Sequence, residues 1–382
     1  MYLCKKINAM EKIFVYGTAT AGKNFTNRKK EIQRISMNFR DGMNTIIISP
    51  RRWGKTSLVR HVANAVQNKN LKIVFLDIFA CKTEEEFFKQ FSKAIIQQTS
   101  NKWEEWVENA KIFLSNINIK FTFGKDPLTE FSMEFELNKD IDPAYILNLP
   151  ERIAQAKNIK IVVCIDEFQQ IGEFKDSKVF QKKLRTQWQL HQKTSYCLFG
   201  SKRHLMIELF ENKSLPFYKF GDIIFLEKID KQHLSAYIQE RFSSNGKKIS
   251  EDIANQICDF TDCHSSYTQQ LAWLVWGYTK TRATKKELDS AIEDLLAQTT
   301  PFFQQEIEPL TFYQLNFVRA LKDGICSEFY RKEISDKYNL GTTANIKRII
   351  TTLQKREIIS IDGKNISIED PIFEKWLKIN LK

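Results

Sequence analysis

The chain has 382 residues, enough for two or three domains, and its 42% hydrophobic content can bury more than one core. This composition excludes a mainly disordered protein. No window approaches the roughly 18 uncharged apolar residues of a membrane span, and the first ten residues lack the pattern of a signal peptide. We therefore expect no membrane partner and a cytoplasmic location.

The net charge of +12 is concentrated near the start of the chain. Residues 1–60 contain 13 basic and 3 acidic residues, residues 61–300 contain 32 of each, and residues 301–382 contain 13 basic and 11 acidic residues. Cations gathered around one loop fit a compact polyanion such as a nucleotide as well as they fit a nucleic acid.

Short apolar runs alternate with helical patterns in the first part of the chain. The runs are Thr45–Ile48, Lys72–Ile78, Ile159–Ile165, Ser195–Phe199 and Asp222–Leu226, and helical patterns such as Ser57–Gln67, Glu84–Gln98 and Val179–His191 lie between them. Strands that alternate with helices and are apolar throughout predict a parallel sheet covered on both faces, which is a doubly wound α/β core.

One stretch interrupts this alternation. The amphipathic segment Trp103–Phe113 is followed by two alternating segments within Asn118–Leu137, around the turn Gly124–Pro127. This pattern predicts an inserted β-hairpin within residues 101–146.

The pattern becomes helical after residue 229. We predict an α/β core at residues 1–229, a helical lid at 230–305 and a winged-helix domain at 306–382, where short helices precede a hairpin centred on Asp362-Gly363. Trp273 and Trp276 have helical spacing and are expected in the core of the lid.

The seven cysteines include no CxxC pair, which favours a reducing compartment over a disulfide framework. Cys258, Cys263 and His264 form the nearest approach to a metal cluster, but their spacing does not match a zinc knuckle, and we interpret them as a helix end with ordinary thiols. Cys164 and Cys197 lie in apolar runs and are expected to be buried.

The strongest chemical signal is the segment Ser49–Thr56 (SPRRWGKT), between a predicted strand and a predicted helix. In such a loop the backbone amides surround phosphates, Lys55 neutralises the β and γ oxygens, and the Thr56 hydroxyl binds Mg²⁺. We therefore expect ATP or ADP as a ligand. The candidate contacts are Pro50, Arg51, Arg52, Trp53, Gly54, Lys55, Thr56 and Ser57.

The roles of two loop residues, Ser49 and Trp53, each have two interpretations. Ser49 replaces the first glycine of the pattern, which weakens phosphate binding only if that position requires a conformation restricted to glycine. Trp53 either packs near the nucleotide or packs against the lid.

A second signal lies about 110 residues later, where the apolar run Ile161–Ile165 ends in Asp166 and Glu167. A carboxylate at the end of a strand can hold Mg²⁺ through its water shell, and its neighbour can deprotonate the attacking water. We expect Asp166 on the metal side and Glu167 as the general base.

The sequence resembles the archaeal-type ATPases, which belong among the AAA+ and STAND-related P-loop NTPases. The resemblance rests on SPRRWGKTSLV, IVVCIDEFQQI, SYCLFGS, SLPFYKFGDIIFL and the tail IEDPIFEKWL, and it covers nearly the whole chain. It implies an AAA+-like ATPase core, a helical lid and a C-terminal winged helix.

The resemblance also implies roles for single residues. Phe25 and Arg28 lie in the segment similar to the one that contacts adenine, and Ser201 matches the polar sensor of the γ-phosphate, with Arg203 as a helper. Where the family often has an arginine, the stretch Pro216–Gly221 offers Lys219, which lacks a guanidinium fork. His264 either contacts the nucleotide or caps a helix.

Two surfaces of the predicted winged helix could meet partners. The helix Thr343–Arg356 buries Ile346, Ile349, Ile350 and Leu353, and it exposes Lys347, Arg348, Lys355 and Arg356. Duplex DNA contact, a solvated face and a protein-docking surface all remain open.

The tail places Ile372, Phe373, Trp376 and Leu377 at helical spacing, a face that needs a partner surface unless it folds back onto the winged helix.

We expect an ATP-dependent molecular switch, in which slow, Mg²⁺-dependent hydrolysis to ADP resets the lid and the winged helix. The alternative is a DNA-binding regulator with a structural nucleotide that is not turned over. Glu167 distinguishes the two because a structural nucleotide site needs no base.

Overall fold

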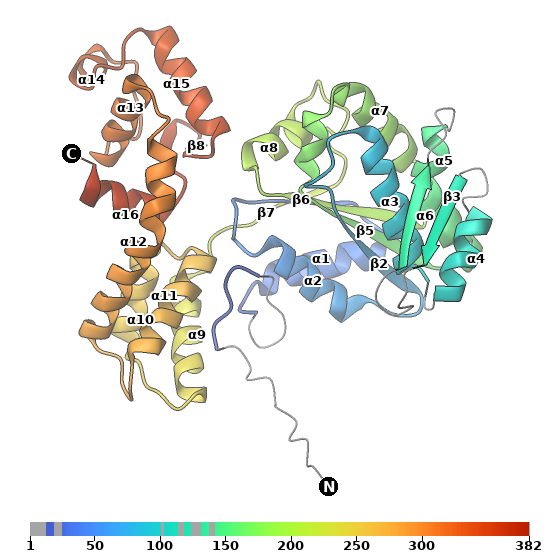
Figure 1. The fold of residues 1–382 in the computed structure, drawn as a ribbon, viewed down its shortest axis with the longest axis horizontal. Coiled ribbons are helices and arrows are strands. Elements are labelled where there is room, and N and C mark those ends of the chain that lie inside the picture. The colour runs from blue at the N-terminus through green and yellow to red at the C-terminus, as the bar shows by residue number, and fades with distance from the viewer. Residues whose placement is uncertain are drawn as a thin grey trace. The chain divides into compact units, whose positions relative to one another are not determined.

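The computed structural model describes residues 13–18, 25–100, 103–113, 118–123, 131–136 and 142–381 (Figure 1). The chain forms two compact units, which we call the core unit (Ala19–Glu227) and the helical unit (Met1–Thr18 with Lys228–Lys382). The helical unit is therefore built from two separate parts of the sequence, and the chain passes from one unit to the other twice.

The core unit alternates strands with helices. Its elements are α1 (Lys29–Asp41), β1 (Thr45–Ile48), α2 (Lys55–Val66), β2 (Leu71–Asp77), α3 (Glu84–Gln98), α4 (Trp103–Phe113), β3 (Asn118–Phe123), β4 (Phe131–Glu136), α5 (Pro143–Leu147), α6 (Leu149–Lys157), β5 (Lys160–Asp166), the 3₁₀ helix η2 (Phe168–Glu173), α7 (Ser177–Trp188), β6 (Thr194–Gly200), α8 (Arg203–Glu211) and β7 (Asp222–Phe225).

The central sheet of the described residues has five parallel strands in the order β2-β5-β6-β1-β7. β1 lies between β6 and β7, and β5 lies between β2 and β6. Because all five strands run the same way, the ends of β1, β2, β5 and β6 meet at one edge of the sheet. The predicted parallel P-loop sheet is confirmed.

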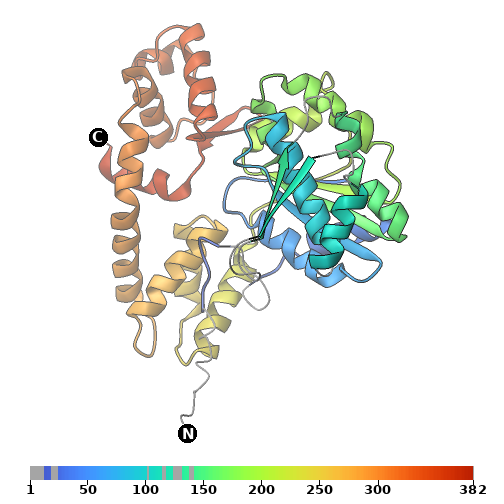
Figure 2. The same ribbon diagram turned by 45° about the vertical axis from the view of Figure 1, so that its right-hand side comes forward.

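The strands are apolar throughout because both faces of the sheet are covered. Ile46 and Ile48 of β1 face a core formed with α3 and α7, whereas Ile47 faces a second core formed with α1 and α2. Figures 1 and 2 show these helix pairs on opposite sides of the sheet. Cys164 and Cys197 lie in the second core with no exposed surface, as expected.

The predicted inserted hairpin is present. β3 and β4 pair antiparallel, with Asn118 opposite Glu136 and Phe123 opposite Phe131. Its predicted turn, Gly124–Pro127, lies outside the described residues.

The helical unit contains the predicted helices and a small hairpin. Its elements are α9 (Lys231–Ser244), α10 (Glu251–Phe260), α11 (Ser265–Tyr278), α12 (Lys285–Ile307), α13 (Phe312–Lys322), α14 (Lys332–Lys337), α15 (Thr343–Lys355), β8 (Ile359–Asp362), β9 (Asn365–Ile368) and α16 (Pro371–Asn380). The winged-helix pattern is confirmed. α12 runs through residue 305, where we place the boundary between lid and winged helix, so these two parts share one helix.

Side-chain caps mark where several of these helices begin. Ser250 accepts a hydrogen bond from the Ile253 amide at the start of α10, and Asp370 does the same for the amides of Ile372 and Phe373 in α16. Such caps satisfy backbone donors that have no partner within the helix.

Residues 13–18, the N-terminal segment, pack on the helical unit. Phe14 is 3% exposed and contacts the rings of Tyr237 and Phe242. The Arg241 Nε donates to the Ile13 carbonyl oxygen at 2.7 Å, and the Val15 amide donates to Gln269 Oε1 at 3.1 Å.

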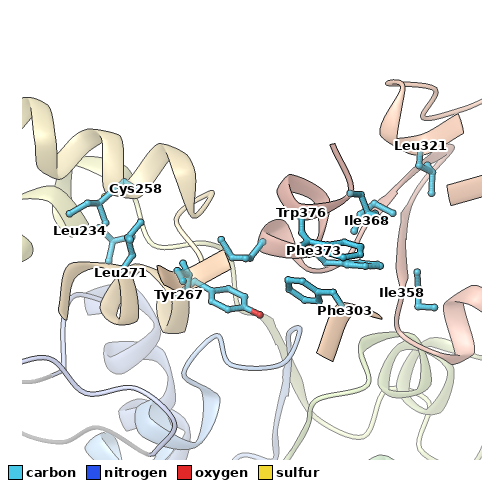
Figure 3. Close-up of a cluster of buried hydrophobic side chains, with 14 of the residues drawn as sticks. Leu234, Cys258, Tyr267, Leu271, Phe303, Leu321, Ile358, Ile368, Phe373 and Trp376 are labelled. Atoms are coloured by element: carbon cyan, nitrogen blue, oxygen red, sulfur yellow. The ribbon is translucent and has the colours of Figure 1, made fainter. Parts of the chain in front are cut away.

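The core of the helical unit is continuous from the lid helices to the tail helix (Figure 3). Phe303 of α12 packs against Phe373 and Trp376 of α16, and the Trp376 Nε1 donates to Thr300 Oγ1 at 3.0 Å. The Tyr267 hydroxyl of α11 donates to Asp370 Oδ2 at 2.5 Å. The tail therefore folds back within its own unit: α16 contacts α13 and β9 of the winged helix, as one interpretation expected, and its apolar face is also covered by the lid helix α12.

One core prediction is wrong. Trp273 is 43% exposed and contacts Tyr16 of the N-terminal segment, with 5.8 Å between the ring centroids. Trp276 is partly buried and packs against the core of the unit. Helical spacing places both residues near one face of α11, but it does not say how far that face is covered.

No helix among the described residues is long and apolar enough to cross a membrane. The same residues contain no group of three or more His, Cys, Asp or Glu side chains that could hold a metal ion.

Candidate functional site

Gly54 ends the loop between β1 and α2. Gly54 has a φ of 90°, a left-handed conformation that favours glycine. Ser49 is not among the described residues with positive φ. The open question about Ser49 is therefore answered for the backbone, because this position needs no glycine.

The Lys55 ammonium group lies inside this loop. The residue is 6% exposed, and its Nζ donates to the carbonyl oxygens of Pro50 (2.7 Å) and Ser49 (3.0 Å) and to Ser49 Oγ (3.3 Å). The hydroxyl at the first glycine position thus adds an acceptor for the lysine. Phosphate oxygens carry full charge and are stronger acceptors than these neutral groups.

Thr56 and Asp166 come together although 110 positions separate them. The Thr56 Oγ1 donates to Asp166 Oδ2 at 2.7 Å. Burial raises the pKa of the Asp166 carboxyl to about 6, the Thr56 hydrogen bond opposes this shift, and the nearby Glu167 carboxylate adds to it. A hydroxyl and a buried carboxylate are oxygen ligands of the kind Mg²⁺ takes, and a cation there would offset the burial of the charge.

Glu167 lies beside Ser201, the residue that follows β6. Glu167 Oε2 accepts hydrogen bonds from Ser201 Oγ (2.9 Å) and the Ser201 amide (3.3 Å). Ser201 is 8% exposed, and Glu167 has a φ of 55°. The structure therefore brings together the predicted base and the predicted sensor.

The sequence analysis missed Gln169. This residue is 2% exposed, and its Nε2 donates to the same Glu167 oxygen. A Cβ at Gly200 would lie 1.7 Å from Gln169 Oε1, so the glutamine fits only because β6 ends in glycine. A glutamine two positions after Glu167 has no spacing signal that would identify it.

Arg28 connects the loop to the end of the core unit. It is 6% exposed, and its guanidinium donates to the carbonyl oxygens of Trp53 (3.3 Å) and Glu227. Burial lowers the pKa of Arg28, and the nearby Glu31 opposes that shift. Phe25 stacks on His61 of α2, with 4.5 Å between centroids.

The other predicted loop residues differ in how far their side chains are exposed to solvent. Arg51 and Arg52 are exposed, Pro50 is partly buried, and Ser57 is buried. Trp53 packs against the core formed with α1 and α2, beside the sheet.

Lys219, Arg203 and His264 are the remaining candidates. Lys219 is exposed beside the Tyr218 ring, and Arg203 begins α8. His264 lies in the helical unit, is 7% exposed, and accepts a hydrogen bond at Nδ1 from the Tyr267 amide at 3.4 Å. The capping interpretation of His264 is confirmed by this contact.

The predicted recognition helix is α15. It buries Ile346, Ile349 and Leu353, and it exposes Lys347, Arg348 and Lys355. Arg356 differs from the prediction, because it is partly buried and its guanidinium donates to the Glu306 carbonyl oxygen at 3.1 Å.

Comparison with solved structures identifies similar folds. The Walker-type ATPase PABY2304 of Pyrococcus abyssi matches with 13% identity and a TM-score of 0.68, over 96% of this chain and all of that one. The Aeropyrum pernix ORC2 protein, in its ADPNP and ADP complexes, matches with 12% identity and a TM-score of 0.59, over 92% of each chain. Comparison with curated proteins gives no match.

Two family models match the sequence itself. One, described as an ATPase domain predominantly from Archaea, covers residues 25–271, and the other, described as a probable winged helix domain, covers residues 301–379. The first match contains the loop, the end of β5 and Ser201, and it spans more than half of the chain. The chain therefore belongs to the archaeal ATPase family and joins a P-loop NTPase fold to a C-terminal winged helix.

Proposed function

We propose that this protein is an ATP-dependent molecular switch that hydrolyses ATP slowly. One observation carries the proposal: the loop lysine, the Thr56–Asp166 pair and the Glu167–Ser201 pair lie together at the ends of β1, β5 and β6. A site that only holds a nucleotide needs the lysine and the Thr56–Asp166 pair. The Glu167–Ser201 pair combines a candidate base with a candidate γ-phosphate sensor, which are groups that hydrolysis uses.

The binding roles follow from the contacts. The backbone of Pro50–Ser57 and the Lys55 ammonium bind the phosphates of ATP or ADP, and Thr56 with Asp166 holds Mg²⁺, which neutralises phosphate charge when bound. Phe25 and Arg28 form the adenine side of the site. The nucleotide complexes of the ORC2 protein support this choice of ligand. A nucleotide contact of His264 stays a prediction.

Glu167 removes the proton from the attacking water in this proposal. Its Oε2 is engaged by Ser201 and Gln169, which occupies lone pairs that a base needs. A γ-phosphate offers the Ser201 hydroxyl a charged acceptor. Transfer of that hydrogen bond from Glu167 to the phosphate would release the base only when ATP is present.

The helical unit supplies the response. Its lid helices and its winged helix share one continuous core, so we propose that a nucleotide-dependent movement carries both together. The winged helix then meets a protein partner. A cytoplasmic location, expected from the cysteine usage, completes this proposal.

A second candidate is a winged-helix regulator that binds duplex DNA and keeps its nucleotide unhydrolysed. It is favoured by Lys347, Arg348 and Lys355, which are exposed on α15. Charge argues against it, because residues 301–382 contain only two more basic than acidic residues.

A steady-state phosphate-release assay, with and without duplex DNA, distinguishes the candidates. Glu167→Gln should keep ATP bound and slow release at least about a hundredfold. Glu173→Gln is the matched control, because Glu173 is 47% exposed and pairs with Lys202. Asp166→Asn should weaken the Mg²⁺ dependence of binding. Hydrolysis by Glu167→Gln at the wild-type rate would contradict the catalytic assignment. Tight ATP binding by the wild-type protein without any phosphate release would favour the DNA-binding regulator.

A further inference from the structure

The turn that ends α10 has a defined hydrogen-bond pattern. The Cys263 amide donates to the Cys258 carbonyl oxygen at 2.9 Å, and the Asp262 amide donates to the Asp259 carbonyl oxygen at 3.3 Å. Asp262 and Cys263 have φ values of 51° and 54°. This pair of bonds is a Schellman motif, in which the first residue past the cap is left-handed.

A Schellman motif brings two particular side chains into contact, one from the last turn of the helix and one from just beyond it. In most helices this contact is apolar. Here both positions are cysteines, so the motif places the thiols of Cys258 and Cys263 next to each other. Cys258 has no exposed surface, whereas Cys263 is partly exposed.

The two thiols differ in their surroundings. Hydrogen bonding with Cys258 lowers the pKa of the Cys263 thiol, and the nearby Lys228 ammonium acts in the same direction. The same hydrogen bond and burial raise the pKa of Cys258. A thiol with a lowered pKa and access to solvent attacks oxidants, and a buried neighbour can then displace the product.

We propose that Cys258 and Cys263 form a reversible dithiol–disulfide pair that responds to small-molecule disulfides. The Cys263 thiolate attacks glutathione disulfide, which gives a mixed disulfide and releases one glutathione thiolate. Cys258 then gives its proton to the released glutathione thiolate and attacks the Cys263 sulfur, which releases the second glutathione. Two protein thiols are oxidised, and one external disulfide is reduced to two thiols. Transient disulfides of this kind fit a reducing compartment.

The surrounding contacts indicate what the disulfide constrains. Lys228 and Lys231, where the chain enters the helical unit, pair with Asp262 and Asp259 of the same turn. His264, which caps α11, follows Cys263 directly. The disulfide therefore fixes the turn between α10 and α11 beside the junction of the chain with the core unit.

The test uses the full chain with Cys4→Ser and Cys326→Ser, which removes one exposed thiol and one that lies outside the described residues. The reduced protein is incubated with glutathione disulfide, quenched by alkylation and mapped by mass spectrometry. We expect loss of two hydrogen atoms and a Cys258–Cys263 cross-link that dithiothreitol reverses. Hydrogen exchange at the Tyr267 amide should slow in the oxidised form.

Two variants separate the steps. Cys258→Ser should stop at the glutathione adduct of Cys263, and Cys263→Ser should leave Cys258 unmodified. Cys81, also buried, serves as the internal control that stays reduced. A stable Cys263 adduct in the protein that retains Cys258, or no reaction at Cys263, would overturn the proposal. That measurement does not depend on whether either variant folds.

Discussion

Lys55 and Glu167 are both held by groups of the protein itself. Carbonyl oxygens of the loop accept from the lysine, and donors from Ser201 and Gln169 engage one oxygen of the glutamate. A nucleotide phosphate can replace the loop carbonyl oxygens as the acceptor for Lys55, and it can attract the Ser201 hydroxyl away from Glu167. The chemistry of the site therefore depends on a few exchanges of hydrogen bonds.

Lys55→Ala should abolish nucleotide binding, because the lysine lies inside the loop and supplies charge to the phosphates. Titration with a fluorescent ATP analogue measures the effect, and a circular dichroism spectrum checks the fold. Lys175→Ala, at an exposed lysine, should bind normally. Unchanged affinity in folded Lys55→Ala would refute the loop assignment.

Gly200→Ala should destabilise the core unit by about 1–3 kcal/mol, because the new methyl group would overlap Gln169 Oε1. Displacing Gln169 also removes a donor to Glu167, so phosphate release should change as well. Urea unfolding and the release assay measure the two effects. Gly172→Ala is the control, since its Cβ would meet nothing within 4 Å, and equal behaviour of the two variants would count against this account.

At the scale of elements, buried polar groups join helices to the sheet. His191, after α7, donates from its Nε2 to Asn148 Oδ1 (2.8 Å), and its Nδ1 accepts a hydrogen bond from the Tyr196 hydroxyl of β6 (2.9 Å). Burial lowers the pKa of His191 to about 4, and the nearby Glu151 opposes this shift. The folded protein therefore keeps this imidazole neutral over much of the acidic range.

This pKa shift predicts how stability depends on pH. The unfolded chain binds a proton at His191 near pH 6.5, but the folded chain does so only near pH 4, so stability falls as pH decreases between these values. The loss should reach at most about 3 kcal/mol. Urea unfolding from pH 7.5 to 4.5 measures it. His191→Gln should remove this contribution, so that its stability falls less from pH 7.5 to 4.5 than that of the wild type, whereas His233→Gln, at an exposed histidine, should leave the dependence unchanged.

Much of the fold could be predicted from the sequence because its signals are local. The ends of Thr45–Ile48 and Glu84–Gln98 agree with β1 and α3, since an apolar run and a 3.6-residue period each reflect one element's own burial. The loop and Asp166 were found because motif spacing identifies them. Gln169 and the contact between Arg28 and the Trp53 carbonyl were missed, because only the folded chain brings those residues to the site.

At the scale of the whole molecule, the helical unit is held together through its tail. Trp376 is 4% exposed, and it joins α16 to α12 through Phe303 and Thr300. Pro301 lies inside α12 next to these contacts. A proline in a helix removes one backbone hydrogen bond, so the side-chain packing around it helps to keep α12 in one piece.

Trp376→Ala should destabilise the helical unit by about 3–5 kcal/mol, as expected for removing a large buried side chain. Chemical unfolding followed by circular dichroism measures the change. Trp273→Ala is the matched control and should have a much smaller effect, since that side chain is 43% exposed. Similar losses in both variants would show that Trp376 has no special role.

The switch proposal predicts that hydrogen exchange in residues 311–381 differs between ADP and a non-hydrolysable ATP analogue. The reason is that lid and winged helix share one core, so a response of one reaches the other. Unchanged protection, combined with nanomolar and salt-sensitive binding of duplex DNA by the full chain, would reverse the order of the two candidate functions.

The N-terminal segment gives synthesis on the ribosome a definite order. Val15 and Ile13 leave the ribosome early, but their partners Gln269 and Arg241 follow 254 and 228 positions later. Domains generally fold as units while the chain is made, so the core unit can be complete before these partners exist. Until α9 is made, Phe14 is an uncovered apolar side chain of the nascent chain, and its burial waits for Tyr237 and Phe242 of the helical unit.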